Sequence, residues 1–264
     1  MLRPRISPCL LIRNGGLVKT EKFKNEKYIG DPINAVKIFN EKSVDELIII
    51  DIDATRLGLE PNYALLQRLA NESRMPLCYG GGIKECKQAK KIIQMGFEKI
   101  ALSSAALAKP EILRMIANAV GKQSVVGVLD VKKNMFGNYS IYTNNGTKKI
   151  NGKLTDWINT FQDSGAGEIL INSIDRDGTR MGYDLNLVKS TINHFSVPST
   201  FLGGASSLFD IGELIALRGV GGCAAGSMFV FKGKYRAVLI SYPKFKEKYE
   251  LILKSMEKYF KSIK

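Results

Sequence analysis

Two apolar runs of similar type end on different residues, and the difference bears on the chemistry available to the chain. Residues 124–130 read SVVGVLD and end on Asp130, whereas the run PCLLI at 8–12 has Leu11 at the matching place. A partly buried carboxylate can accept or deliver a proton, because burial raises its pKa toward neutrality. Leucine can do neither. The alternative interpretation of Asp130 is a structural carboxylate that pairs with Lys132 or Lys19.

Glycine and serine residues follow other apolar runs in two sets. The first set is Gly80, Gly81, Gly82, Ser103 and Ser104, and the second is Asp177, Gly178, Gly203, Gly204, Gly226 and Ser227. Glycine turns let backbone N–H groups approach an anion, and helix N-termini add a favourable partial charge. Each pair alone is also typical of a tight turn. Two sets at corresponding places predict two cradles for a ligand with two phosphates or an equivalent pair of anionic groups.

Further charged residues accompany the same runs. Lys19 lies in a predicted long loop after the first run, where it would contact the ligand as part of a mobile lid or else be solvated. Four more carboxylates are expected mainly to position hydroxyl groups and loop backbone: Asp51, Asp53, Asp175 and Asp177.

Short apolar strands that alternate with helices would position these residues. The predicted strands are 6–12, 46–51, 76–79, 99–102, 124–130, 168–172, 198–202 and 223–226. Their lack of strict polar and apolar alternation is typical of parallel strands covered by helices. Asp31-Pro32 and Lys109-Pro110 mark helix starts, and the second helix has Ile112, Met115 and Ile116 on its apolar face. Eight such units predict an α/β fold, a single (β/α)8 TIM barrel with one functional rim.

The two halves of the chain resemble each other. The second strand ends IIIDIDAT and the sixth LINSIDRDGT, which places Asp51 and Asp175 in step, 124 residues apart. The same comparison sets Leu11 against Asp130, 119 residues apart. A barrel with a two-fold half-barrel repeat would carry two similar half-sites, so the loss of one carboxylate is a meaningful difference.

Composition narrows the classes of function. The chain of 264 residues is 45% hydrophobic and 24% charged, as expected of one globular domain over residues 1–264. It has no run that could span a membrane and no signal peptide, so the cytoplasm is the default. Four separated cysteines and the single His194 offer no metal-ligand spacing. The net charge of +14 fits a solvated surface, an anionic substrate or an acidic partner. Nucleic acid is disfavoured, because no binding motif accompanies the scattered lysines.

Several motifs resemble the cyclase subunit of imidazole glycerol phosphate synthase. They are GGGI at 80–83, GAGEIL at 165–170, IDRDGT with GYD within 173–184, and the glycine pair with Ala205 at 203–205. The resemblance implies a barrel of the ribulose-phosphate-binding type, a phosphorylated small-molecule substrate, and no metal or organic cofactor. It also implies a separate glutaminase subunit docked at the barrel bottom, from which ammonia travels through the barrel. A family ring of four charges would fall on Arg5, Glu46, Lys99 and Glu168, where it fits a gate and equally a plug.

The departures from that family are as informative as the matches. The family's cyclase uses two aspartates as its acid and base, and here Asp130 remains while Leu11 replaces the first. PCLLIRNGGLVKT and RAVLISYP are similar to a paralogous branch, the acetamidino-modification proteins of surface-polysaccharide and nonulosonate sugar pathways. There the barrel and its glutaminase are thought to supply ammonia to a sugar amidotransferase. Residues 229–243, FVFKGKYRAVLISYP, replace the family's usual last helix, and 229–264 is then either a docking surface or a covering helix with a basic face.

Three hypotheses follow. The first is an ammonia-conducting synthase subunit that serves the conversion of an acetamido to an acetamidino sugar. The second is a true cyclase, which makes imidazole glycerol phosphate from the formimino-carboxamide ribonucleotide and ammonia with a rearranged acid and base set. The third is a barrel without catalysis that scaffolds or activates the glutaminase. All three predict a glutaminase partner.

Overall fold

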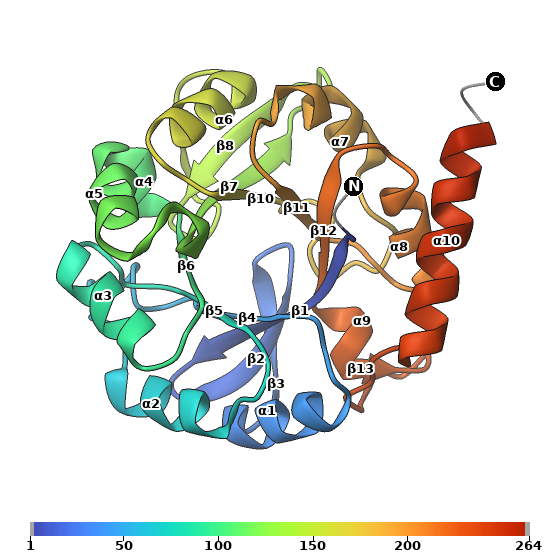
Figure 1. Ribbon diagram of the computed structural model, residues 1–264, viewed down its shortest axis with the longest axis horizontal. Helices are drawn as coiled ribbons and strands as arrows, with labels where there is room; N and C mark the ends of the chain where they lie inside the picture. Colours follow the sequence, from blue (N-terminus) through green and yellow to red (C-terminus); the bar gives the residue numbers. More distant parts are fainter. Residues whose placement is uncertain (1–2, 262–264) are drawn as a thin grey trace.

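The computed structural model describes residues 3–261 and is a closed barrel of parallel strands surrounded by helices (Figure 1). β12 pairs with β1, and β10 pairs with both β7 and β11, so the sheet has no open edge within the barrel. The predicted (β/α)8 fold is therefore confirmed. Its strands are β1 (Arg5–Arg13), β4 (Leu47–Asp51), β5 (Leu77–Gly80), β6 (Lys99–Leu102), β7 (Val125–Lys133), β10 (Glu168–Ser173), β11 (Ser199–Leu202) and β12 (Val220–Ala225).

Helices cover the outside of the barrel, and their starts follow local chemistry. The Asp31 side chain accepts a hydrogen bond from the Asn34 amide, and Pro32 occupies the first turn of α1. Met115 on α5 is 55% exposed, so its predicted burial is wrong, although Ile112 and Ile116 are buried as expected. The helices are α1 (Pro32–Glu41), α2 (Tyr63–Glu72), α3 (Cys86–Gln94), α4 (Ser104–Ala108), α5 (Glu111–Val120), α6 (Leu154–Asp163), α7 (Leu185–Thr191), α8 (Leu208–Ile215), α9 (Ser227–Val230) and α10 (Phe245–Lys261), with 3-10 turns η1 (Lys122–Ser124) and η2 (Ile192–His194).

The two hairpins that follow β1 and β7 at their C-terminal ends were not predicted from the sequence. β1 continues into the antiparallel strands β2 (Gly16–Glu21) and β3 (Lys24–Gly30), where a long loop was predicted. β7 likewise continues into β8 (Tyr139–Thr143) and β9 (Lys148–Lys149). The first strand of each half is thus nine residues long and runs past the rim. The half-barrel repeat extends to these hairpins.

The barrel interior is a separate apolar layer. It contains residues that alternate along the strands with those facing the helices: Cys9, Ile48, Cys78, Ala101, Val126, Leu170 and Ala224. The larger hydrophobic core lies between the strands and the helices, as parallel strands buried on both faces require. Three of the four cysteines are buried as free thiols, and Cys86 is partly exposed.

The last part of the chain departs most from the prediction. β12 begins three residues before the predicted strand and ends before Gly226, which leads instead into the short α9. A hairpin of β13 (Phe231–Lys232) and β14 (Ala237–Val238) follows, and then α10, which packs on α8 (Figure 1). Residues 229–264 therefore contain a covering helix, and 262–264 lie outside the described residues.

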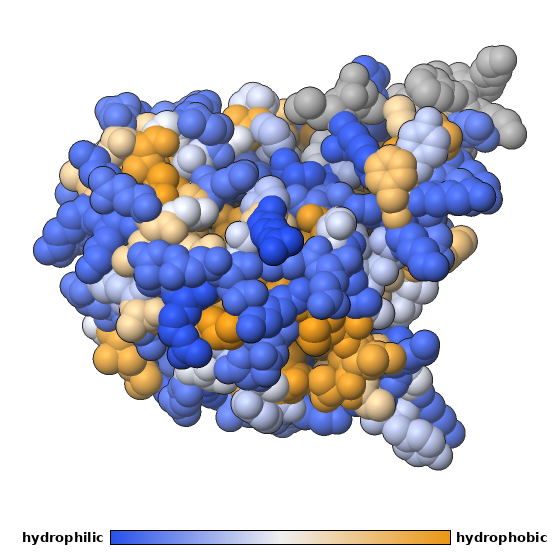
Figure 2. Space-filling model, turned by 60° about the horizontal axis from the view of Figure 1, so that its bottom comes forward, coloured by the Kyte–Doolittle hydropathy of each residue, from blue (hydrophilic) through white to orange (hydrophobic). Residues whose placement is uncertain are grey.

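The face shown in Figure 2 is largely hydrophilic, with separate apolar patches between hydrophilic residues. Between residues 3 and 261, no helix combines the length and the apolar character needed to cross a bilayer.

Replacement of a buried aromatic side chain in the core between helices and sheet tests this packing. Phe161 on α6 is fully buried and makes an edge-on contact with Trp157. We expect Phe161→Ala to lower the free energy of unfolding by about 3–5 kcal/mol through lost burial and a residual cavity. Phe209→Ala, at a side chain that is 68% exposed, should change it by less than about 0.5 kcal/mol. Urea titration measures both, and similar losses in the two variants would contradict this packing.

Candidate functional site

A cavity opens at the C-terminal ends of the strands, and Leu11 and Asp130 both line it. Its inner wall is otherwise mostly apolar, with Ile50, Val128, Leu170 and Leu202 facing the space. β7, which carries Asp130, and β1, which carries Leu11, therefore contribute to one site. Asp130 is the carboxylate that this wall carries on β7.

Asp130 sits in an environment that favours its protonated form. Burial raises its pKa to about 6, and the nearby Asp177 charge adds to the rise. The Asn172 amide donates to Asp130 Oδ1 at 2.9 Å and partly opposes the shift. A carboxyl group with such a pKa can exchange a proton near neutral pH. The lysines considered as its structural partners bond elsewhere, Lys132 to the Gly146 carbonyl and Lys19 to the Cys9 carbonyl.

Lys19 is neither in a loop nor solvated. It lies on β2, where its side chain is 6% exposed and its ammonium group donates to the Cys9 carbonyl. Burial lowers its pKa, while neighbouring Cys9 and Asp177 act in the opposite direction. A side chain at Gly226 would collide with the Lys19 ammonium, which therefore fills the space beside that glycine.

The first predicted cradle opens into the cavity. Gly81, Gly82, Ser103 and Ser104 all line it. Gly81 has a φ of +123°, and a side chain there would collide with the Asp51 backbone, so this turn requires glycine. Ser104 shares a hydrogen bond with Thr143, whereas Ser103 Oγ is buried without a partner among the described residues. The Ser103 hydroxyl also lies near enough to Asp130 to lower the pKa of that carboxyl, so it belongs to the same polar part of the cavity.

The second predicted cradle is largely covered. Of its residues, only Asp177 and Gly226 line the cavity. The Thr20 carbonyl lies against Gly178, and the Gly182 carbonyl lies against Gly204. Gly203 faces the Ser173 carbonyl, and Ser227 is buried at the start of α9. The two half-sites are thus brought to one rim, but the β2–β3 hairpin covers one of them.

Acidic residues at the rim hold loops in place. Asp51 accepts from the Asp53 and Ala54 amides, and Asp175 accepts from the Lys133 amide. Asp53 binds Arg13 and Arg56, which lower its pKa against the effect of burial. Asp177 accepts from the Thr20 hydroxyl at 2.9 Å and from the Phe23 amide. The last two bonds join the β2–β3 hairpin to the loop after β10.

Asn172 is the site residue that the sequence prediction missed. It stands directly across from Asp130 in the β7–β10 register, is 7% exposed, and lines the cavity. Its Oδ1 is buried without a hydrogen-bond partner among the described residues. The signal available in the sequence was an amide near the end of the apolar run EILINS.

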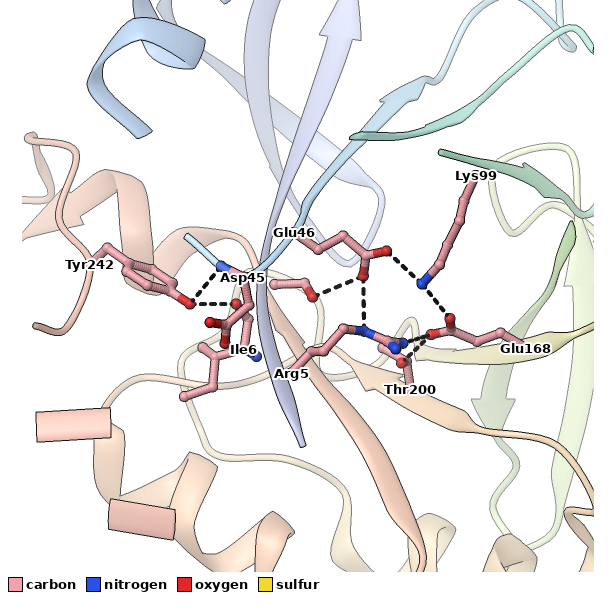
Figure 3. Close-up of polar contacts among 9 residues, drawn as sticks. Arg5, Ile6, Asp45, Glu46, Lys99, Glu168, Thr200 and Tyr242 are labelled. Carbon is pink, nitrogen blue, oxygen red and sulfur yellow. Dashed lines mark hydrogen bonds and ion pairs between the residues drawn. The ribbon is translucent and has the colours of Figure 1, made fainter. Parts of the chain in front are cut away.

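The opposite end of the barrel is closed by a ring of charges (Figure 3). Lys99 Nζ lies 2.7 Å from Glu46 Oε1 and 2.8 Å from Glu168 Oε2. Arg5 binds the same two carboxylates, at 3.3 Å for Glu46 and 2.5 Å for Glu168. The Ser7 hydroxyl donates to Glu46, and the Thr200 hydroxyl donates to Glu168. The four predicted charges are therefore brought together with every cation between two anions.

Mutual attraction keeps these groups ionised despite burial. Burial by itself would lower the pKa of Lys99, but Glu168 and Glu46 raise it above its usual value. Burial likewise works against ionisation of Glu168, and Lys99 and Arg5 hold the pKa of that carboxyl below its usual range. Cys78 and the apolar interior layer lie directly above the ring.

Comparison with known proteins shows the family to which this chain belongs. The model of the family described as histidine biosynthesis protein matches residues 5–236. The chain belongs to this family. A Vibrio vulnificus protein, named provisionally as imidazole glycerol phosphate synthase subunit hisF3, is 53% identical over 94% of this chain and 96% of its own. A provisionally named HisF subunit of Leptospira borgpetersenii is also 53% identical, over 92% of this chain and 96% of its own.

More distant relatives carry the name imidazole glycerol phosphate synthase subunit HisF without the provisional label. The imidazole glycerol phosphate synthase subunit HisF of Streptococcus sanguinis is 37% identical over 87% of this chain and 91% of its own. The predicted resemblance to the HisF-type cyclase subunit is thereby confirmed.

Replacement of Asp130 should reveal the energetic cost of its charge. Because the fold raises this pKa to about 6, it favours the protonated carboxyl, and the ionised form destabilises the native state above that pH. We expect Asp130→Asn to be more stable than the natural protein by about 1–3 kcal/mol at pH 8. The difference should vanish below about pH 4, where both states bind the proton. Urea unfolding across this range measures it, and a difference that does not change with pH would contradict the shift.

Loss of one cation from the ring should lower the free energy of unfolding by a large amount. Lys99→Met leaves two buried carboxylates with only Arg5, and we expect it to lower the free energy of unfolding by about 3–5 kcal/mol. The control is Lys37→Met, which breaks an exposed pair with Glu72 at 3.7 Å and should cost less than about 1 kcal/mol. Equal effects would mean that the ring charges are well solvated.

Proposed function

We propose that the chain is the synthase subunit of a glutamine-dependent amidotransferase. A glutaminase partner binds at the charged ring and releases ammonia there. The ammonia crosses the apolar interior and reaches an acceptor in the cavity at the opposite rim. Membership of the imidazole glycerol phosphate synthase family supports this direction of flow.

Two features support the conduit. Ring and cavity lie at opposite ends of the same strands, since Glu168 begins β10 and Asn172 lies near its other end. The interior between them consists of small and apolar side chains. Neutral ammonia can enter such a layer, whereas ammonium would pay the cost of an unpaired buried charge. The ring would then admit ammonia and hold back ions.

The observation that carries the choice of reaction is that Leu11 and Asp130 line the same cavity from matching places in the two halves. A cyclisation that uses these two places for its acid and base has only one of them here, since leucine cannot move a proton. We therefore assign the transfer of ammonia to an acetamido sugar, in which the ammonia nitrogen replaces the acetamido oxygen, lost as water, to give an acetamidino group. A sugar amidotransferase is the partner that would hold this acceptor. The similarity of PCLLIRNGGLVKT and RAVLISYP to that branch supports the assignment.

One observation favours the cyclase as second candidate. Asp130 has a pKa near 6 and remains at the rim of a barrel that is 37% identical to a HisF subunit. A water molecule or Lys19 would then have to replace the missing carboxylate. A scaffold without catalysis has no such observation in its favour.

The test supplies ammonium at alkaline pH and the formimino-carboxamide ribonucleotide to the purified chain, with a HisF subunit assayed beside it. We expect no turnover by the natural chain, because a lost acid or base typically costs about 10²–10⁴-fold. Leu11→Asp restores the missing carboxylate and should raise turnover above the detection limit. Turnover by the natural chain that Asp130→Asn abolishes would establish a cyclase and refute the proposed reaction.

A further inference from the structure

A second polar cluster lies on the outer side of the barrel wall, next to the ring. Arg5 is followed by Ile6, and Glu46 is preceded by Asp45. The Tyr242 hydroxyl donates to the Ile6 carbonyl at 2.7 Å and accepts from the Asp45 amide at 3.3 Å (Figure 3). One hydroxyl from the C-terminal part of the chain thus joins the starts of two strands, each of which carries a ring residue.

The backbone ladder does not hold these two strand starts together. The β1–β4 register pairs Cys9–Ile12 with Ile48–Asp51 and ends there. Ile6 is paired only on its other side, with Cys223 of β12. The gap between Ile6 and Asp45 is bridged by side chains: Tyr242, as described, and the Asp45 carboxylate, which accepts from the Ile6 amide at 3.0 Å.

Helix α10 supplies the charge that fixes Asp45. Lys248 is 4% exposed, and its ammonium lies 2.6 Å from Asp45 Oδ1 and 4.8 Å from the centre of the Tyr242 ring. An ammonium buried in this way strongly favours its carboxylate partner. Lys248, Asp45 and Tyr242 therefore form one unit, which spans from α10 to the backbone beside Arg5 and Glu46.

We propose that Tyr242 and Lys248 are positioning residues for the ring, so that residues 242–248 determine how readily the ring opens. Arg5 and Glu46 meet at 3.3 Å only while β1 and β4 keep their spacing at this end. Loss of the Tyr242 bridge lets the two strand starts separate, and the ring then opens more often. The inference adds a control element to the proposed ammonia entrance and rests on that function for its purpose, but the mechanical claim can be measured separately.

Three buried cysteines provide local reporters. Cys78 pairs in register with Lys99 and belongs to the interior layer above the ring. Cys9 belongs to the same layer but also lines the cavity that opens at the opposite rim. Cys223 is fully buried on the helix-facing side of β12. A small reagent that enters through the ring reaches Cys78 first, one that enters through the cavity reaches Cys9 first, and global unfolding exposes all three.

The experiment follows modification of each cysteine by methyl methanethiosulfonate at pH 8, with peptide mass spectrometry, in the full chain and in Tyr242→Phe. We expect Cys78 to react about tenfold faster in the variant, which corresponds to about 1.4 kcal/mol in ring opening. Cys9 and Cys223 should keep their rates. Lys248→Met, which removes the charge from the same unit, should have the same selective effect.

The matched control is Tyr183→Phe. Its hydroxyl is also buried and donates to a strand carbonyl, that of Ala224 at 2.9 Å, but it has no contact with the ring unit. In this variant the modification rate of Cys78 should rise no more than that of Cys223, each compared with the natural protein. An unchanged Cys78 rate in Tyr242→Phe, or equal acceleration of all three cysteines, would overturn the inference. Turnover in the ammonium assay would refute the proposed reaction but leave these rates unaffected, so the two claims are separable.

Discussion

The alternation of two cations and two anions at one end of the barrel is the constraint on which the rest depends. Each charge is acceptable in that position only because it lies between two of opposite sign. Three of them begin β1, β6 and β10, and Glu46 directly precedes β4, so they fix the relative heights of strands that are far apart in the sequence. With the strands held in this way at one end, their opposite ends form one rim, and the cavity has a defined shape.

That rim shows how two similar halves can diverge without a change of fold. Both halves retain a strand that runs past the rim into a hairpin, and both retain their glycine turns. One half has kept an open cradle, whereas the other has Lys19 and Thr20 in its place. The wall between them carries Asp130 with its partner Asn172 on one side and Leu11 on the other. A ligand in this cavity therefore meets a carboxyl group and an amide at one place in the wall and a hydrocarbon at the matching place.

The fold could be predicted from the sequence because it depends on local signals, namely apolar runs and helix starts such as the Asp31-Pro32 cap. The ring has no local signal, because its four charges are far apart in the sequence, and it was predicted from the family resemblance. The state of Lys19 could not be predicted, since its burial depends on a hairpin that pairs β2 with β1 and lies over β10's loop. Asn172 was missed because its importance comes from the register that sets it beside Asp130. The spacing within α5 does not distinguish Met115, which is exposed, from Ile112 and Ile116, which are buried.

The position of β1 has a consequence for the order of folding during synthesis. β1 emerges from the ribosome before the other strands, yet one of its neighbours is β12, and its Ile6 carbonyl accepts from Tyr242, 236 residues later. Asp45, whose carboxylate binds the same strand, pairs with Lys248, which follows it by 203 residues. The contacts of the first strand can therefore be completed only when nearly the whole chain has been translated, and until then β2 and β4 are its native neighbours. Truncation of the last helix would affect the N-terminal strand before it affected the middle of the barrel.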